Sequence, residues 1–385
     1  MPDRSLRKEF IFDCPISVFM HIFQRIESKF KQAHNSPLKR TNPFYKMKSS
    51  KIIVIFGATG SQGGALVRAI LTHDTQKEFY IRAITRNRDS EKALKLTKMM
   101  ISEEENRVEV VEADANDLEQ VTMALKDAYG AFFVTNPFDP SSCATLDLES
   151  KQAWNFAKAS EVVGLHHAIW STTEDPLEDV SMESDAIPTL TVTSQDGSQT
   201  CYKLPHFENK AKGDGFFEEF SVPTTFILPG FFYENFLSYF PLKREGEDNS
   251  LQFLVPTGDA KIPMTSAEDI GKVAFAIFQG GPKEFAGKKI GISTEHLSMD
   301  DVSERFSKVL GERVSNNKFV TAEIFSTFGF PMCQELANMF MYWRDFNTQY
   351  RSRRSVDETK KIYADLTSFE DFVQENKEIF VKSFS

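Results

Sequence analysis

Residues 51–64 read KIIVIFGATGSQGG, an apolar run that ends in a glycine-rich turn. The run is continuously apolar rather than alternating, which is typical of a strand buried on both faces of a parallel sheet. The segment 64–74, GALVRAILTHD, follows with apolar residues on one helical face. A glycine-rich turn between a strand and a helix is the context in which such turns bind the phosphates of a dinucleotide.

The three glycines of this turn are expected to have separate roles. Gly57 permits the tight turn, Gly60 lets the backbone approach a pyrophosphate, and Gly63 lets the helix pack closely on the strand. The pyrophosphate is expected over the free N–H groups at the start of the helix, where the helix dipole is positive. A left-handed turn that binds nothing is the alternative.

Strands and helices alternate after this turn. Such alternation predicts βαβ units with right-handed crossovers, and therefore a Rossmann-type doubly wound parallel sheet in an α/β fold. The predicted strands are 79–85, 107–113, 131–135, 166–171 and 224–230, and the predicted helices are 91–100, 117–125 and 148–160. Asp117 is placed to cap the helix that it begins.

The pattern changes beyond residue 230. We assign 50–228 to an NAD(P)-binding domain and 229–385, including the strand 288–293, to a smaller C-terminal α/β domain with an interleaved boundary. Ser266 is the expected cap of a helix over 267–279, and 368–380 is a further helix. An aromatic stripe in the helix 335–346 is expected to lie in the core; it consists of Phe340, Tyr342, Trp343 and Phe346.

The charge of the chain is uneven. Residues 1–50 hold ten Lys and Arg against four Asp and Glu, a charge of +6. Since the whole chain has a net charge of −10, the remaining 335 residues carry −16. We interpret 1–49 as a mobile basic extension, and the acidic remainder argues against broad nucleic-acid binding. The sequence contains no run of 18 apolar residues, so we predict no membrane-spanning helix. The four cysteines lack metal-binding spacing, which predicts buried thiols in a cytoplasmic protein, with the nucleus as a second location.

The end of the second predicted strand bears on the choice of cofactor. A site that prefers NAD has an acid there, which bonds the ribose 2′-hydroxyl. This chain instead has Thr85, Arg86, Asn87 and Arg88. Because guanidinium groups bind a 2′-phosphate that an acid would repel, these residues favour NADP(H) over NAD(H). A solvated basic turn is the alternative.

The usual acid of a short-chain dehydrogenase is missing. None of the nine tyrosines is followed by a lysine four positions later. The candidate replacement is Lys210, in the segment 205–220, although a surface lysine without a role is the commoner case. Gly213 and Gly215 are expected to shorten this helix and to hold Lys210 less rigidly, because glycine destabilises a helix interior.

Several motifs together resemble one family. GATGSQGG (57–64), TRNRDSEKA (85–93), VTNP (134–137), HFENK (206–210) and LPGFFYENFL (228–237) are similar to those of the NmrA-like family, an atypical branch of the short-chain dehydrogenases. The segments 255–271 and 329–340 resemble animal members of that family. The resemblance spans about residues 50–380.

This resemblance implies NADP(H) in a cleft between the two domains and a redox sensor more than a catalyst. Such proteins change conformation or oligomeric state, including homodimers, and thereby alter their binding of regulatory partner proteins. The implied cofactor-binding residues are Gly57, Ala58, Thr59, Gly60, Ser61, Gln62, Arg86, Asn87, Arg88, Asp89, Ser90, Asp114, Ala115, Thr135, Asn136, Pro137, Lys151, Lys210, Phe232, Tyr233, Glu234 and Asn235.

The chain also departs from the family pattern. Arg88 and Asp89 stand where a proline and a base are expected, so Arg86 is the more secure phosphate ligand. The stretch 174–206 is longer than expected, with six acids and no base between Glu174 and Asp185, followed by an inserted hairpin that turns at 196–197. We interpret it as a solvated surface insertion, with a partner-binding or lid element as the alternative.

Two functions from different classes are consistent with these observations. The first is an NADP(H)-sensing regulator with little turnover, acting through partner proteins and without direct nucleic-acid or membrane contact. The second is an NADPH-dependent reductase of quinones or enones that uses Lys210 as proton donor. The missing tyrosine and the C-terminal motifs favour the first.

Overall fold

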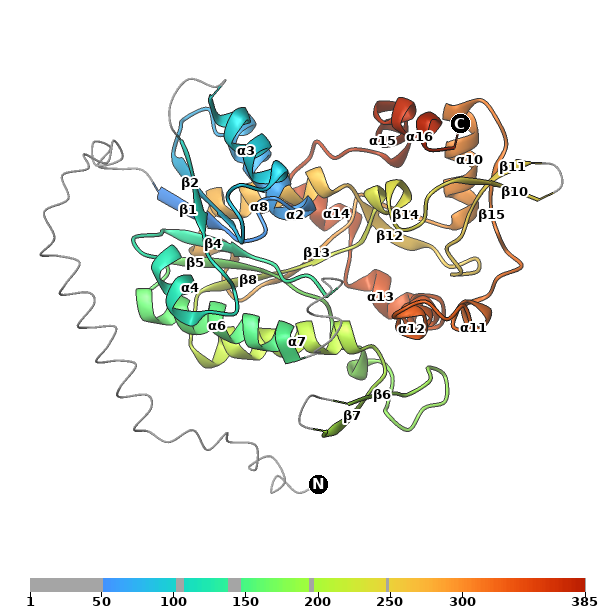
Figure 1. Ribbon diagram of the computed structural model, residues 1–385, viewed down its shortest axis with the longest axis horizontal. Helices are drawn as coiled ribbons and strands as arrows, with labels where there is room; N and C mark the ends of the chain where they lie inside the picture. The colour runs from blue at the N-terminus through green and yellow to red at the C-terminus, as the bar shows by residue number, and fades with distance from the viewer. Residues whose placement is uncertain (1–50, 102–106, 138–146, 194–196, 247–248, 385) are drawn as a thin grey trace, which may run out of the picture. The chain divides into compact units, whose positions relative to one another are not determined.

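A seven-stranded parallel sheet forms the centre of the molecule (Figure 1). The computed structural model describes residues 51–101, 107–137, 147–193, 197–246 and 249–384. The sheet has the order β13-β8-β5-β4-β1-β2-β3, and every adjacent pair is parallel. Its strands are β1 (Lys51–Ile55), β2 (Phe79–Thr85), β3 (Val108–Glu112), β4 (Gly130–Phe133), β5 (His167–Ser171), β8 (Thr224–Pro229) and β13 (Lys289–Ile292). The predicted fold class is confirmed.

Helices cover both faces of the sheet (Figure 1). On one face lie α2 (Ser61–His73), α3 (Glu91–Ile101) and α8 (Ala267–Gly280), and on the other α4 (Leu118–Ala124), α6 (Asp147–Val163) and α7 (Pro205–Glu219). The central strands are buried on both sides, which explains their continuously apolar sequences. The expected caps are present, since Asp117 and Ser266 accept hydrogen bonds from the backbone N–H groups of Gln120 and Asp269.

The strand predicted at 288–293 does not belong to the smaller domain. It is β13, and it pairs with β8 as the seventh strand of the central sheet. Its crossover helix, α8, packs so closely on α2 that a Cβ on Gly271 would lie 2.4 Å from the backbone carbon of Ala65. A strand that follows such a helix returns to the sheet by the usual crossover. Its own few residues gave no indication of which sheet it would join.

Helix α7 is longer than predicted. It runs for 15 residues, through both Gly213 and Gly215, with Lys210 near its middle. A Cβ on Gly213 would lie 2.9 Å from Trp170 Cζ2 and 3.0 Å from Ala153 Cβ, so close packing on β5 and α6 requires a glycine there. Packing therefore offsets the weak helix propensity. Lys210 is held on a regular helix, contrary to our expectation.

The rest of the C-terminal half builds a second core. Its three-stranded sheets are β10 (Lys243–Glu245), β11 (Ser250–Phe253) and β15 (Val314–Asn316), and β14 (Glu295–Leu297), β12 (Ile262–Thr265) and β9 (Phe231–Phe232). Its helical segments are η4 (Tyr233–Leu237), α10 (Met299–Leu310), α11 (Ala322–Phe325), α12 (Cys333–Asp345), α13 (Asn347–Ser352), α15 (Phe369–Glu375) and α16 (Lys377–Phe384). Helices α9 (Pro282–Phe285) and α14 (Val356–Ile362) instead pack in the core between the central sheet and α8.

Aromatic rings fill this second core. Phe340, Tyr342 and Trp343 of the predicted stripe are buried, and Phe346 packs against them partly buried. The helix predicted over 368–380 is divided between α15 and α16 at Asn376. Residues Ser50–Ser385 form one compact unit, so the C-terminal half contributes to the layers of the central sheet as well as to this core.

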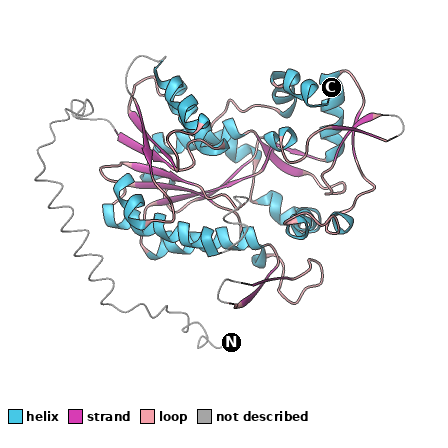
Figure 2. Cartoon of the chain, viewed as in Figure 1, coloured by secondary structure: helices cyan, strands magenta, loops and turns pink. Residues whose placement is uncertain are grey.

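The predicted hairpin in the insertion is present (Figure 2). Strands β6 (Leu190–Thr193) and β7 (Gln199–Tyr202) form an antiparallel two-stranded ribbon, and part of its predicted turn, Asp196, lies outside the described residues. The acids before it are not simply solvated. Glu174 and Asp179, which flank η3 (Pro176–Glu178), form ion pairs with Arg354 and Arg353.

Two further expectations concern the chain as a whole. None of the described helices is long and apolar enough to cross a membrane. Cys333 is a buried free thiol, but Cys201 is exposed on β7, contrary to the expectation of four buried cysteines. Cys14, Cys143 and the extension 1–49 lie outside the described residues.

Candidate functional site

A glycine cradle lies between β1 and α2. Gly57 has a φ of +68°, a conformation that favours glycine. A Cβ on Gly63 would lie 2.4 Å from the Gly57 carbonyl oxygen, so any side chain there would push α2 away from the turn. Gly60 precedes the helix without a capping side chain, and the first turn of α2 contains no acid. The uncapped N–H groups and the absence of negative charge fit a pyrophosphate.

The other residues of the turn support this cradle in different ways. Ala58 is buried in the core and Thr59 is half-buried, whereas Ser61 is exposed at the start of α2. Gln62 reaches across the edge of the sheet, where its Oε1 accepts a hydrogen bond of 2.8 Å from Ser171 Oγ at the end of β5. Ser171, which the sequence did not single out, thus lies beside the predicted phosphate site.

Asn87 organises the loop after β2. Its backbone N–H donates to Thr85 Oγ1, its Oδ1 accepts from the Asp89 N–H, and its carbonyl oxygen accepts from Ser90 Oγ. Arg86 and the rest of 86–89 are exposed at the edge where an adenosine ribose is expected. The loop is therefore structured and open to a ligand.

An acid also contacts this loop. The Arg88 N–H donates to Glu112 Oε2 at 3.3 Å, and Glu112 pairs with Thr85 in the β2–β3 register. Glu112 belongs to the neighbouring strand, so examining the residues directly after β2 missed it. Its charge opposes a 2′-phosphate and reduces the preference that Arg86 and Arg88 would give alone.

The residues predicted near the adenine lie in the loop between β3 and α4. Asp114 Oδ1 accepts hydrogen bonds of 2.9 Å from both the backbone and the side-chain nitrogens of Asn116. The Ala115 carbonyl oxygen accepts from Asn155 Nδ2 on α6 at 2.8 Å. These contacts fix the loop at the C-terminal edge of the sheet.

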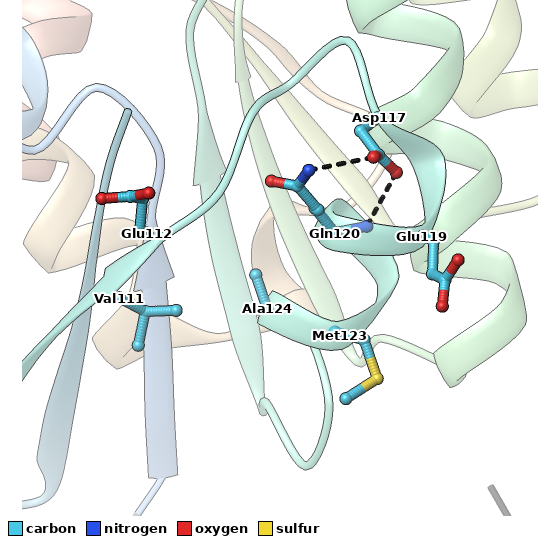
Figure 3. Close-up of a pocket in the computed structure, with 7 residues that line it drawn as sticks. All are labelled: Val111, Glu112, Asp117, Glu119, Gln120, Met123 and Ala124. Carbon is cyan, nitrogen blue, oxygen red and sulfur yellow. Dashed lines mark hydrogen bonds between the residues drawn. The ribbon is translucent and has the colours of Figure 1, made fainter. Parts of the chain in front are cut away.

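A shallow hollow adjoins this loop between β3 and α4 (Figure 3). Glu112, Asp117 and Glu119 line it, and Figure 3 shows Gln120 bonded to Asp117 through both its backbone and its side chain. Three carboxylates would repel the phosphates of a dinucleotide. The glycine cradle, whose first helical turn contains no acid, therefore fits a phosphate better than this hollow does.

Lys210 lies in a closed polar cluster near the end of β4. Its Nζ donates to the Thr135 carbonyl oxygen at 3.1 Å and to Thr135 Oγ1 at 2.7 Å, and lies 3.1 Å from Glu149 Oε1. Thr135 Oγ1 in turn donates to Glu149 at 2.6 Å. An ammonium group has three donors, and three acceptors surround this one. The side chains of Lys210 and Glu149 are only 12% and 6% exposed.

Sequence reasoning missed Glu149. It lies in the first turn of α6, on the inward face that also carries Ala153 and Phe156, and this periodicity was the available signal. Lys151, predicted to approach the ribose, is exposed on the same helix and is not part of the cluster. Beyond Thr135, Asn136 is exposed and Pro137 half-buried, and the loop continues outside the described residues.

The segment 232–235 divides between two surroundings. Phe232 packs partly buried against the core between the sheet and α8. Tyr233 is fully buried in the second core, where its ring contacts Phe369 and its hydroxyl donates to Glu295 Oε2 at 3.3 Å. The Tyr233 side chain therefore cannot line a ligand pocket. Asn235 is half-buried in η4, and its carbonyl oxygen accepts backbone bonds.

Glu234 lies against the N-terminus of α8. Both of its carboxylate oxygens lie 3.0 Å from the Ala267 nitrogen. Burial, with smaller contributions from Glu268 and Asp269, raises the pKa of Glu234 to about 7, although the backbone bonds act in the opposite direction. This carboxyl group titrates near neutral pH.

The parallel sheet and the glycine cradle define a Rossmann-type fold with a dinucleotide-type phosphate site. The sequence profile of the NmrA-like family matches residues 49–373, and the chain belongs to this family. The NmrA-like family domain-containing oxidoreductase himF of Aspergillus japonicus is 25% identical over 352 residues, which cover 84% of this chain and 98% of that protein.

Two solved structures share the fold. The negative transcriptional regulator NmrA in complex with NADP superposes with a TM-score of 0.67 at 20% identity, covering 87% of this chain and 98% of that one. The Citrobacter triphenylmethane reductase complexed with NADP(H) gives a TM-score of 0.62 at 18% identity, covering 84% and 99%.

Proposed function

We propose that this chain binds NADP(H) and acts as a redox-responsive regulator with little hydride transfer of its own. Membership of the NmrA-like family and the glycine cradle support dinucleotide binding. NADP in the NmrA structure and NADP(H) in the triphenylmethane reductase support the choice of cofactor. The segments 255–271 and 329–340 resemble the animal NmrA-like family domain-containing protein 1, which supports the regulatory role.

The observation that carries the proposal is that the Lys210 ammonium group is fully hydrogen-bonded within the protein. Its ammonium group is surrounded by Thr135 and Glu149, so no donor is left for a substrate. Glu149 also neutralises the charge that would stabilise a developing oxyanion. The bound nicotinamide would supply a hydride. The chain lacks the motif of a tyrosine followed four positions later by a lysine, whose tyrosine is the usual proton donor. These features support binding without efficient turnover.

The second candidate is an NADPH-dependent reductase of quinones or enones. The names of the himF oxidoreductase and of the triphenylmethane reductase favour it. For this function Lys210 would have to leave Thr135 and Glu149 when substrate binds.

Calorimetric titration with NADP, NADPH, NAD and NADH tests the binding proposal. We expect the phosphorylated forms to bind more tightly by about tenfold, and Arg86→Ala to narrow that difference. Gly60→Val should abolish binding by placing a branched side chain where the pyrophosphate lies. Equal affinity for all four, or wild-type binding by Gly60→Val, would refute this site.

Absorbance at the nicotinamide band tests the lack of turnover. Purified protein with a panel of quinones and enones should oxidise NADPH negligibly. Hydrogen exchange should nevertheless change on NADPH binding in the described parts of 174–206 or at the edge of the sheet. Robust turnover that is lost in Lys210→Ala would establish the reductase instead.

A further inference from the structure

The ribbon of β6 and β7 has two open edges. Among the described residues these strands pair only with each other, through four residue pairs from Leu190–Tyr202 to Thr193–Gln199. A two-stranded antiparallel ribbon leaves about half of its backbone N–H and C=O groups on its outer edges. On β7, Gln199, Thr200 and Cys201 are all exposed, whereas β6 alternates between half-buried and exposed residues. The edge of β7 is therefore the more accessible.

This edge lacks the usual protection against pairing. The strand sequences LTVT and QTCY contain no charged residue and no proline. Among the other edge strands, β3 (VEVVE), β10 (KRE), β13 (KIGI) and β14 (EHL) carry charged residues, whereas β9 (FF) and β15 (VSN) are uncharged but only two and three residues long. Charged residues and proline are the common means of blocking strand addition, so their absence leaves the ribbon able to accept a strand.

The ribbon is also fixed at its base. Asn338 Nδ2 on α12 donates 2.7 Å bonds to the carbonyl oxygens of both Pro188 and Lys203, the residues that flank the two strands. Lys203 Nζ is buried and donates to the carbonyl oxygens of Ser184 and Ile187. An isolated two-stranded hairpin is marginally stable in water, and this anchoring presents the strand edge in a defined position.

The surroundings of the ribbon are acidic. Glu183 and Asp185 are exposed on either side of Ser184, which Lys203 ties to the end of β7. The buried ammonium group of Lys203 makes the smallest contribution to the lowered pKa of Glu183, so it offsets these carboxylates only weakly, and the exposed Lys212 lies over the Tyr202 ring. A second copy of this chain would bring the same acids together, and residues 51–385 carry −16 in total. Charge complementarity therefore favours a basic occupant over self-association.

We infer that β7 is a docking edge for an extended, lysine- or arginine-flanked segment of a partner protein, which adds to the ribbon as a third strand. Backbone hydrogen bonds supply affinity, and the charges near Glu183 and Asp185 select the partner. The inference extends the proposed function by giving the regulatory partner a site and a chemistry.

A synthetic peptide provides the test. The sequence of β6 already pairs with one edge of β7, so we use a fluorescent peptide, Lys-Leu-Thr-Val-Thr-Lys, with the full chain. We expect saturable binding by anisotropy and slower hydrogen exchange at 199–202. A version methylated on alternate backbone nitrogens and a version flanked by glutamates should each bind at least about tenfold more weakly, a loss of about 1.4 kcal/mol.

Two variants of β7 complete the test. Thr200→Lys places a charge on the edge and should reduce peptide affinity about tenfold, whereas Thr200→Ser should preserve it. Both should unfold in urea at the same midpoint as the wild type, which shows that they are folded. No saturable binding, or binding unchanged by methylation or by Thr200→Lys, would overturn the inference. Because the peptide is tested without dinucleotide, failure of NADPH binding would refute the proposed function and leave this result interpretable.

Discussion

At the scale of single residues, a residue of the neighbouring strand changes the cofactor preference that the end of one strand predicts by itself. Arg86 and Arg88 follow β2 and indicate a 2′-phosphate site, but Glu112 at the end of β3 accepts a bond from the Arg88 backbone. Arg88 and Glu112 are 24 positions apart in the sequence. Their proximity depends on the pairing of β2 with β3.

Glu112→Gln should increase the preference for NADP over NAD. Removing an exposed carboxylate beside the arginine loop should improve the ratio of the two dissociation constants about twofold, or roughly 0.5 kcal/mol. The ratio is measured by calorimetry at low salt, and added salt should reduce the effect. Glu119→Gln, in the same hollow, is the matched control. An unchanged or smaller ratio in Glu112→Gln would contradict this role.

Glu234 should make stability depend on pH between about 4.5 and about 7. Its pKa is raised to about 7 from 4.5, so over this range the folded state holds a proton that the unfolded state has lost. The favourable contribution of protonated Glu234 to the free energy of unfolding is complete below about pH 4.5. It is lost as pH rises through about 7, by at most about 3 kcal/mol.

Urea unfolding at pH 5 and pH 8 measures this dependence. Glu234→Gln should gain stability relative to the wild type as pH rises, because the buried charge no longer forms. Glu358→Gln is the control, since Glu358 pairs with Lys361 at the surface and does not act on Glu234. If the difference between Glu234→Gln and wild type is the same at both pH values, Glu234 does not titrate as described.

At the scale of the element, α7 shows how packing overrides helix propensity. Gly213 touches Trp170 and Ala153, but nothing lies within 4 Å of a Cβ built on Gly215. Both look equally unfavourable in the sequence. The helix continues through both, which holds Lys210 against Thr135 and Glu149.

The two glycines of α7 should respond oppositely to alanine. Gly215→Ala should stabilise the protein by about 0.5–1 kcal/mol, because alanine favours the helix and meets open space. Gly213→Ala should destabilise it by about 1–3 kcal/mol, because the methyl group overpacks against Trp170. The free energies of unfolding in urea decide this. Equal effects of the two substitutions would show that packing does not set the requirement for Gly213.

At the scale of the whole molecule, a buried ion pair ties the C-terminal helices to the edge of the sheet. Arg354 donates to Glu174 Oε2 at 2.6 Å and to the Pro229 carbonyl oxygen at 3.1 Å, so it joins the ends of β5 and β8. The side chains of Arg354 and Glu174 are 1% and 2% exposed. This contact spans 180 positions in the sequence.

Arg354→Ala should destabilise the protein by about 3–5 kcal/mol, because it leaves the carboxylate of Glu174 buried and unpaired. Arg353→Ala is the matched comparison and should cost less, since its partner Asp179 keeps the 2.5 Å hydrogen bond from Tyr342. Chemical denaturation at neutral pH measures both variants. Comparable losses in the two would show that burial of the Glu174 pair is not decisive.

The sequence by itself determined the parallel sheet, the glycine cradle and the hairpin of the insertion. Each rests on short-range information: an apolar run, a turn whose backbone needs glycine, or two short β-prone runs around a glycine turn. The helix caps at Asp117 and Ser266 are likewise set within a few residues.

Only the tertiary structure decided where β13 pairs, how Lys210 is held and what Glu174 contacts. Lys210 and Thr135 are 75 positions apart, and β13 pairs with a strand some 60 residues earlier. Partners at such separations are chosen by the packing of whole layers and by the need to satisfy buried charges, so local periodicity carries no signal for them. The sequence therefore identified Lys210 as a candidate, but it could not predict that Thr135 and Glu149 surround its ammonium group, which is the contact on which the proposed function rests.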